Sequence, residues 1–205
     1  MTSRTSTAKK GAFHKEILLT GFGGQGIVLA GLILGKAASL GDKKESTLTQ
    51  SYGPEARGGA CSAQVIISDG TIHYPYVRHP DVLVCLSQGG YDKYAAMLKE
   101  GGQLLVDQDL VRSVKAENCD YFAIPATRFA EEMGRKMMAN IVMLGFFTAV
   151  SATVSVESAR NTVEKSVPKG TEQMNLKAFN KGYEFGLATL KGRMKKAAGM
   201  KGVCS

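Results

Sequence analysis

The chain has 205 residues, of which 44% are hydrophobic and 21% charged, and this suits one globular domain with a sizeable core. Collagen, low-complexity disorder and small disulfide scaffolds are excluded. No apolar run reaches the roughly 18 residues that span a bilayer. No apolar segment follows Met1 as a secretory signal requires. We therefore expect a cytoplasmic protein with no membrane partner.

The formal charge of +8 sits at the two ends of the sequence. Residues 1–15 contain four basic side chains and residues 191–205 contain five, with no acidic residue in either stretch. Subtracting these nine from the 26 basic residues leaves 17 for residues 16–190, which hold all 18 acidic ones. The sequence thus predicts a near-neutral domain over 15–190, a flexible basic tail at 1–14 and a basic tail at 191–205. Such tails are solvated ends, arms for an acidic partner or, least commonly, nucleic-acid contacts.

Apolar runs and helical patterns alternate along the first part of the chain. Residues 16–20 predict a strand that opens onto glycines, and residues 25–39 predict a helix that is apolar on nearly every side. A helix of this kind is buried, and its small residues allow close approach to a sheet. Further strands are predicted at 45–49, 60–68, 71–74, 82–86, 103–106 and 121–124.

Local signals join these elements. The Asp69-Gly70 pair is typical of a tight turn, so 60–68 and 71–74 are expected to form a hairpin. Ser87 is expected to cap a helix that reaches residue 98. After Pro125 the pattern predicts helices at 127–138, 139–153, 156–165 and 171–196. This order indicates an α/β domain: a Rossmann-like, mostly parallel sheet flanked by helices, with a β-hairpin and a C-terminal helical segment.

The cysteines and histidines form no metal-binding pattern. The four cysteines are at least 24 residues apart, and the three histidines show no helical pairing. Structural zinc and iron–sulfur sites need closely spaced ligands. We therefore expect neither a metal nor a catalytic residue on this chain, and we expect Cys61 and Cys85 to be small core hydrophobes.

The first candidate site is the sequence Gly21-Phe22-Gly23-Gly24-Gln25-Gly26, which lies between a predicted strand and a predicted helix. Glycines permit a tight turn, and the N–H groups of Gly23 to Gly26 at a helix N-terminus can face an anion. A nicotinamide site would also need an acidic residue at the end of the second strand, near Thr49-Gln50, where none occurs. The loop is therefore a structural turn or faces a phosphate, another ligand or a partner subunit.

The second candidate follows the second predicted strand and runs from Ser51 to Gly59. It contains a phenol, a carboxylate, a guanidinium and three glycines. In doubly wound sheets the ends of parallel strands form the ligand-binding edge, so this segment and the glycine loop should share it. Arg57 could hold a carboxylate or phosphate by paired hydrogen bonds. Alternatively, the segment is an irregular loop in which Glu55 and Arg57 pair with each other or with solvent.

These two stretches together resemble the gamma subunit of 2-oxoacid:ferredoxin oxidoreductases. The resemblance continues at 81–84, 87–88, 91–94, 101–102, 139–145 and 175–182, and it covers roughly residues 15–190. A stand-alone NAD-binding Rossmann oxidoreductase and a basic-tailed nucleic-acid-binding protein are the alternatives. The resemblance itself implies no nucleic-acid partner.

The resemblance implies a reaction and a set of partners. Members of this family oxidatively decarboxylate a 2-oxoacid with coenzyme A to give an acyl-CoA, carbon dioxide and two electrons for ferredoxin or another acceptor. Alpha, beta and ferredoxin-like delta subunits would carry thiamine diphosphate, Mg and 4Fe–4S clusters. The gamma subunit would bind none of these alone and would help to form the coenzyme A cleft. The 2-oxoglutarate type looks most similar, followed by the aryl glyoxylate type, with branched 2-oxoacids and pyruvate as further substrates of the family.

The residues expected to face coenzyme A, the substrate or a neighbouring subunit come from both stretches. They are Gly21, Gly23, Gly24, Gln25, Gly26, Ser51, Tyr52, Gly53, Glu55, Arg57 and Gly58.

A tract of methionine and phenylalanine is a further candidate for subunit contact. Such side chains pack well against another chain, although core packing is the alternative. The tract consists of Met137, Met138, Met143, Phe146 and Phe147.

Overall fold

A mixed sheet forms the centre of the computed structural model, which describes residues 13–52, 59–112 and 118–201. Within these ranges the sheet has six strands in the order β2-β3-β1-β4-β5-β6. They are β1 (His14–Phe22), β2 (Glu45–Tyr52), β3 (Ala60–Ser68), β4 (Val82–Cys85), β5 (Gln103–Asp107) and β6 (Asp120–Ile124). This architecture confirms the predicted α/β fold.

The strand directions bring five strand ends to one edge. β1, β4, β5 and β6 pair in parallel, whereas β3 is antiparallel to both β1 and β2. β2 therefore runs in the same direction as β1, and β3 alone runs the other way. We call the edge where β1, β2, β4, β5 and β6 end the carboxyl edge, and the opposite one the amino edge. Ligands of open α/β sheets bind at the carboxyl edge.

The predicted hairpin between 60–68 and 71–74 is wrong. Residues 71–74 form no strand. β3 is bonded along one side to β1 and along the other to β2, so it has no free edge for a further strand. The antiparallel hairpin is instead β2–β3, and the chain after Ser68 crosses the amino edge toward β4.

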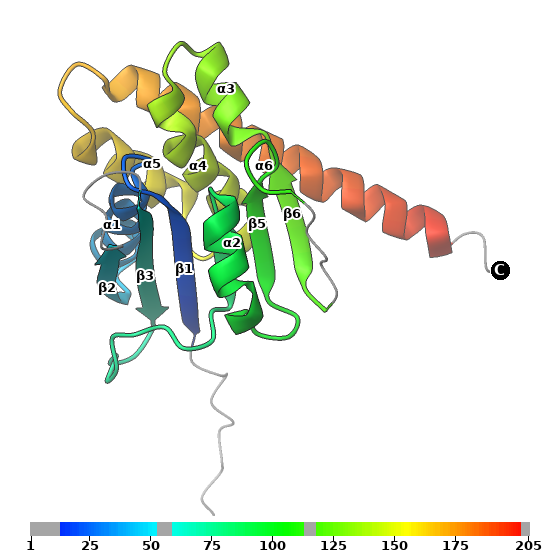
Figure 1. Cartoon of the computed structure of the whole chain (residues 1–205), viewed down its shortest axis with the longest axis horizontal. Helices are drawn as coiled ribbons and strands as arrows, with labels where there is room; N and C mark the ends of the chain where they lie inside the picture. Colours follow the sequence, from blue (N-terminus) through cyan, green and yellow to red (C-terminus); the bar gives the residue numbers. More distant parts are fainter. Residues whose placement is uncertain (1–12, 53–58, 113–117, 202–205) are drawn as a thin grey trace, which may run out of the picture.

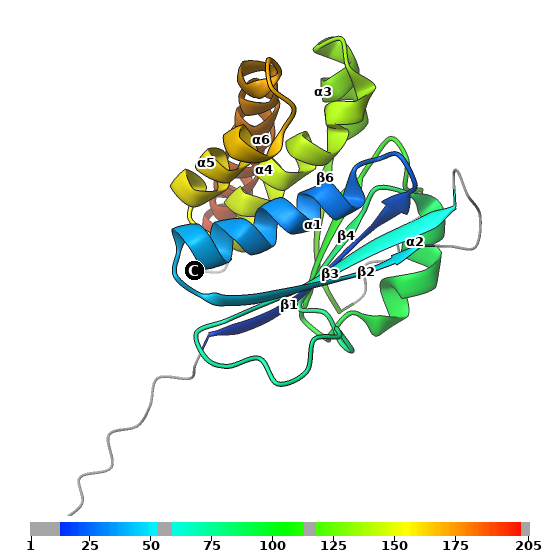
Figure 2. The ribbon, with the colours of Figure 1, turned by 90° about the vertical axis from the view of Figure 1, so that its left-hand side faces the viewer.

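Helices cover the two faces of the sheet unequally (Figures 1 and 2). One face carries α1 (Ile27–Lys36), α4 (Ala139–Ser151), α5 (Val156–Ser166) and α6 (Glu172–Lys201). α3 (Ala126–Glu132) lies beyond the carboxyl edge of the sheet. The other face carries the short helix α2 (Gln88–Tyr94). No helix of the described ranges has both the length and the hydrophobicity needed to cross a membrane.

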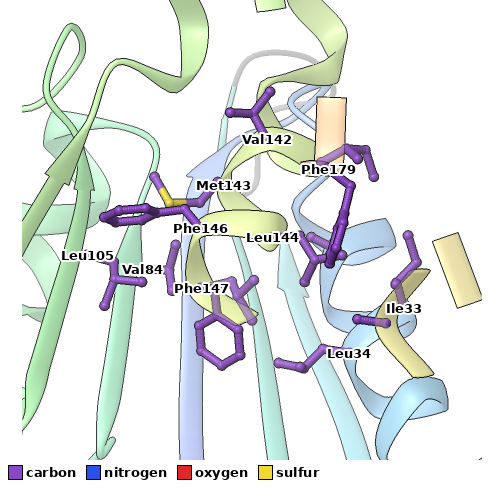
Figure 3. Close-up of a cluster of buried hydrophobic side chains, with 14 of the residues drawn as sticks. Ile33, Leu34, Val84, Leu105, Val142, Met143, Leu144, Phe146, Phe147 and Phe179 are labelled. Atoms are coloured by element: carbon purple, nitrogen blue, oxygen red, sulfur yellow. The ribbon is translucent and has the colours of Figure 1, made fainter. Parts of the chain in front are cut away.

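Helix α4 is the centre of the larger core. Twelve of its 13 residues are buried. Phe146 points toward Val84 and Leu105 of the sheet, whereas Leu144 points toward Phe179 of α6 (Figure 3). Of the two alternatives for the methionine and phenylalanine tract, core packing therefore holds for four of its five members. Met138, Met143, Phe146 and Phe147 are at most 5% exposed, and only Met137 is largely exposed, at 77%.

Most predicted helices occur with shifted ends. Ser87 caps α2 as predicted, its side chain accepting a hydrogen bond from the Gly90 N–H at 3.1 Å. The helix predicted at 127–138 ends at Glu132, because Gly134 takes a left-handed φ of 82° and breaks it. α6 continues to Lys201, so the predicted domain boundary at 190 falls inside a helix. The proposed division into domain and tails remains a prediction.

Asp42 ties the turn after α1 to the start of α5. Its carboxylate accepts hydrogen bonds from the Ser155 hydroxyl (2.6 Å), the Ser155 N–H (2.7 Å) and the Ser158 hydroxyl (2.7 Å). Burial raises the pKa of Asp42, but these hydrogen bonds, with Lys44 nearby, outweigh burial and hold the pKa below its usual value. The bonds therefore stabilise the fold above the pKa of the unfolded chain, about 3.9, and this stability is lost as the pH falls further.

We predict that Asp42→Asn lowers the free energy of unfolding by about 1 kcal/mol at pH 7, at the low end for charged hydrogen bonds because solvent screens the site. Urea unfolding of both proteins at pH 7 and pH 3 checks this, with the exposed Glu184→Gln as control. The difference should shrink at pH 3. An equal difference at both pH values would contradict the role of the charge.

Candidate binding site at the carboxyl edge

The glycine loop between β1 and α1 lies at the carboxyl edge. Gly21 is the buried penultimate residue of β1, while Phe22, Gly23 and Gly24 are exposed. Gly26 is the N-cap of α1 and takes a left-handed φ of 70°, which favours glycine. The loop thus presents the N-terminus of α1 at the edge where ligands of such sheets bind.

The side chain of Gln25 fixes the shape of this loop. Its Oε1 accepts from the Phe22 N–H at 2.6 Å, and its Nε2 donates to the Leu86 carbonyl oxygen at the end of β4 at 2.9 Å. A side chain at Gly21 would collide with Gln25 and Ile27. Gln25 therefore joins two strand ends and has a positioning role that its place in the motif alone did not reveal.

We predict that Gln25→Ala loosens the loop without unfolding the domain. Loss of two hydrogen bonds should lower the free energy of unfolding by about 1–2 kcal/mol and accelerate amide exchange at Phe22. Hydrogen–deuterium exchange with thermal unfolding measures both, and Gln173→Ala, on an exposed position of α6, is the control. Unchanged exchange at Phe22 would show that Gln25 does not hold the loop.

Asn140, the second residue of α4, forms a hydrogen bond to the glycine loop and was not among the predicted site residues. It is 3% exposed, and its Nδ2 donates to the Gly26 carbonyl oxygen at 3.0 Å. Its Oδ1 accepts from the Ile141 N–H at 2.9 Å. A Cβ at Gly26 would overlap this amide. An amide side chain at the start of a largely apolar helix was the available signal, but the contact spans 114 residues of sequence.

The hydrogen bonds of the loop correct the expectation that Gly23 to Gly26 all present N–H groups. The Gly23 N–H donates to the Gly59 carbonyl oxygen at 2.9 Å, and the Gln25 N–H donates to the Phe22 carbonyl oxygen at 3.1 Å. Among the described residues, no acceptor pairs with the N–H groups of Gly24 and Gly26. These two groups and the first turn of α1 remain as donors for an anion.

The second predicted segment begins and ends beside the glycine loop. Cys61 of β3 pairs on one side with Tyr52, at the end of β2, and on the other side with Gly21 of β1. The Gly59 carbonyl oxygen accepts the hydrogen bond from the Gly23 N–H. Ser51 and Tyr52 are exposed, Tyr52 at 62%. The structure therefore brings both ends of this segment to the glycine loop. The expectations for Gly53, Glu55, Arg57 and Gly58 lie outside the described residues.

Two further helices begin near the same edge. Ser87 caps α2 directly after β4. Asp107, fully buried at the end of β5, accepts hydrogen bonds from the N–H (2.9 Å) and hydroxyl (2.6 Å) of Thr127 in α3. Burial raises the pKa of Asp107, although these bonds oppose the rise. The Gly90 N–H of α2 and the Thr127 N–H of α3 are thus already paired and are not available to an anion.

Cysteine, histidine and acidic side chains are the groups that could carry redox or metal-binding chemistry. No group of three or more histidine, cysteine or acidic side chains in this part of the chain could hold a metal ion. Cys61 and Cys85 are buried in the core as predicted, and burial raises the pKa of Cys85 to about 12. At the end of β2 the side chains are Gln50, Ser51 and Tyr52, so the carboxylate that a nicotinamide ribose requires is missing there.

Known proteins share both the sequence and this arrangement. Residues 16–185 match the pyruvate ferredoxin/flavodoxin oxidoreductase family. The chain is 58% identical over 174 residues to the 2-oxoglutarate synthase subunit KorC of Methanocaldococcus jannaschii, covering 83% of this chain and 93% of the relative. It is 36% identical over 173 residues to the pyruvate synthase subunit PorC of Methanothermobacter marburgensis, covering 82% of this chain and 96% of that one.

A solved structure agrees with these sequence relationships. The gamma subunit of a keto/oxoacid ferredoxin oxidoreductase from Geobacter sulfurreducens superposes with a TM-score of 0.76 at 45% identity, covering 85% of this chain and 99% of that chain. The chain belongs to the pyruvate ferredoxin/flavodoxin oxidoreductase family. Within it, the chain is a gamma subunit of a 2-oxoacid:ferredoxin oxidoreductase, an enzyme of several subunits. The NAD-binding and nucleic-acid-binding alternatives are not supported.

Proposed function

We propose that the chain serves a complex that oxidises 2-oxoglutarate with coenzyme A. In this reaction 2-oxoglutarate and CoA yield succinyl-CoA, carbon dioxide, one proton and two electrons, which pass to ferredoxin or another acceptor. The proposal of 2-oxoglutarate as the substrate rests on the sequence identity of 58% to a 2-oxoglutarate synthase subunit, compared with 36% to a pyruvate synthase subunit. An aryl glyoxylate is the second candidate substrate.

The other parts of the reaction belong to partner subunits in this proposal. We place thiamine diphosphate, Mg and the 4Fe–4S clusters on alpha, beta and ferredoxin-like delta subunits. The residues of this chain support that division, since its described part offers neither a metal-ligand group nor a redox-active cysteine pair. The cytoplasm remains the predicted location.

The carboxyl edge is the proposed contribution of this chain to the coenzyme A cleft. Coenzyme A carries three phosphate groups, and the open N–H groups of Gly24 and Gly26 are suited to an anion. The two ends of the Ser51–Gly59 segment lie beside them, and Arg57 is two residues before Gly59 in the sequence. We propose that Arg57, oriented by Glu55, adds a guanidinium to these donors.

Purification of the complex under oxygen-free conditions tests the function. We expect this chain to co-elute with partner subunits that carry an iron chromophore. The complex should reduce a viologen with 2-oxoglutarate in a CoA-dependent way, and faster than with pyruvate, a branched 2-oxoacid or an aryl glyoxylate. Preference for another of the four acids would overturn the substrate. No CoA-dependent oxidation of any of them would overturn the reaction.

A further inference from the structure

The last helix continues beyond the elements that it packs against. α6 has 30 residues and is therefore about 45 Å long at 1.5 Å per residue, whereas α4, its main partner, has 13 residues. The first half of α6 buries Ala178, Phe179 and Gly182. From Lys191 to Ala197 every residue is exposed, and Figure 1 shows this end running out past β6.

Arg193 holds the projecting end in a defined place. Its guanidinium pairs with the Asp120 carboxylate and donates to the Tyr121 carbonyl oxygen, both on β6. The same group lies over the Phe122 ring, 3.7 Å from its centroid. The helix is thus fixed at one point on the sheet edge. A helix with no buried face gains little stability from itself, so this end is suited to contact with something outside the domain.

The surface of this end combines apolar side chains with two lysines, Lys191 and Lys195, that form no ion pair within the described residues. Leu187, Leu190 and Met194 are spaced i, i+3 and i+7, so they lie on one side of the helix. Leu190 is half-buried and packs against the core of the domain, whereas Leu187 is 46% exposed and Met194 is 73% exposed. Lys191 and Lys195 stand one turn apart beside these side chains and repel each other. No acidic residue occurs from Lys191 to the end of the sequence.

We infer that residues 187–197 of α6 dock on another polypeptide of the complex, in an apolar groove flanked by carboxylates. An amphipathic helix recognised through i, i+3 and i+7 side chains is a common mode of binding between proteins. Carboxylates on the partner would neutralise Lys191 and Lys195. A nucleic acid would be bound through its phosphates alone and would leave Leu187 and Met194 in water. The inference rests on the proposed function, because it requires the other subunits.

Charge reversal in the co-expressed complex tests this surface. Lys191→Glu/Lys195→Glu should lower at least tenfold the amount of this chain that stays with its partners at moderate salt. Leu187→Ser/Met194→Ser, which keeps the charge, should weaken retention independently of salt. The control is Lys165→Glu/Lys169→Glu, which should behave as wild type. Both lysines are exposed and have the same spacing in sequence, Lys165 in the last turn of α5 and Lys169 in the turn before α6. Size-exclusion chromatography over a salt series gives the retained fraction.

The outcomes separate this inference from the proposed function. Wild-type retention of both double variants would overturn the docking helix while leaving the gamma subunit in its complex. Bound nucleic acid that nuclease removes and that Lys191→Glu/Lys195→Glu abolishes would replace a protein partner by a nucleic acid. A wild-type chain that purifies without any partner would overturn the proposed function and, with it, this inference.

Discussion

Gly182→Ala should lower the free energy of unfolding by about 3 kcal/mol, the largest effect that we expect from a single methyl group. A Cβ at Gly182 would overlap the carbonyl oxygen of Val142, and a Cβ at Gly145 would overlap that of Phe179. α4 and α6 therefore touch backbone to backbone at two glycines. No change of side-chain rotamer can relieve such an overlap, so the helices must separate and loosen the core around Phe146.

Gly192→Ala is the matched control in the same helix. A Cβ at Gly192 meets no heavy atom within 4 Å, so alanine should stabilise the exposed helix by about 0.5–1 kcal/mol. Urea unfolding of the two variants and the wild type gives both values. Equal effects of the two substitutions would show that helix propensity, not the close contact of α4 with α6, sets the result.

Arg57→Lys should raise the apparent KM for coenzyme A about tenfold or more and leave assembly and thiamine content unchanged. The lysine keeps the positive charge but loses the paired hydrogen bonds of the guanidinium. Loss of one charge-assisted contact costs about 1.5–3 kcal/mol, which corresponds to this change. Steady-state kinetics of the complex with varied CoA measures it.

The control is Arg78→Lys, between β3 and β4 at the amino edge, which should leave the KM for CoA unchanged. A different outcome for Arg57 would be equally clear. If Arg57→Ala breaks up the complex with no effect on CoA kinetics, this residue is a subunit contact and our ligand assignment is wrong.

Most strands and helices were predictable because each depends on residues that are close together in the sequence. The apolar runs gave the strands from β1 to β6, and Ser87 gave the start of α2. The pairing of β3 was predicted wrongly, because an Asp-Gly turn does not indicate which strands pair with the two edges of β3. β1 and β2 take both of them.

The position of the candidate site in the fold was predictable from the sequence, but the hydrogen bonds that hold the site together were not. The glycine motif and the strand ends indicated the carboxyl edge. The support by Asn140 and the bond from Gly23 to Gly59 join residues far apart in sequence, so no spacing could reveal them. The proposed coenzyme A role comes from the family resemblance and not from the geometry of this chain. Met143 and Phe147 are buried in the core. Their sequence could not distinguish this from a subunit contact, because methionine and phenylalanine suit a core and an interface equally.

Hydrogen–deuterium exchange of the intact complex, with and without saturating coenzyme A, tests the central claim that the carboxyl edge of this chain faces that ligand. We predict slower exchange on CoA binding in residues 22–29 and 51–59, and no change in residues 71–80 at the amino edge. Unchanged exchange in 22–29 and 51–59, with CoA bound and turnover intact, would contradict the claim.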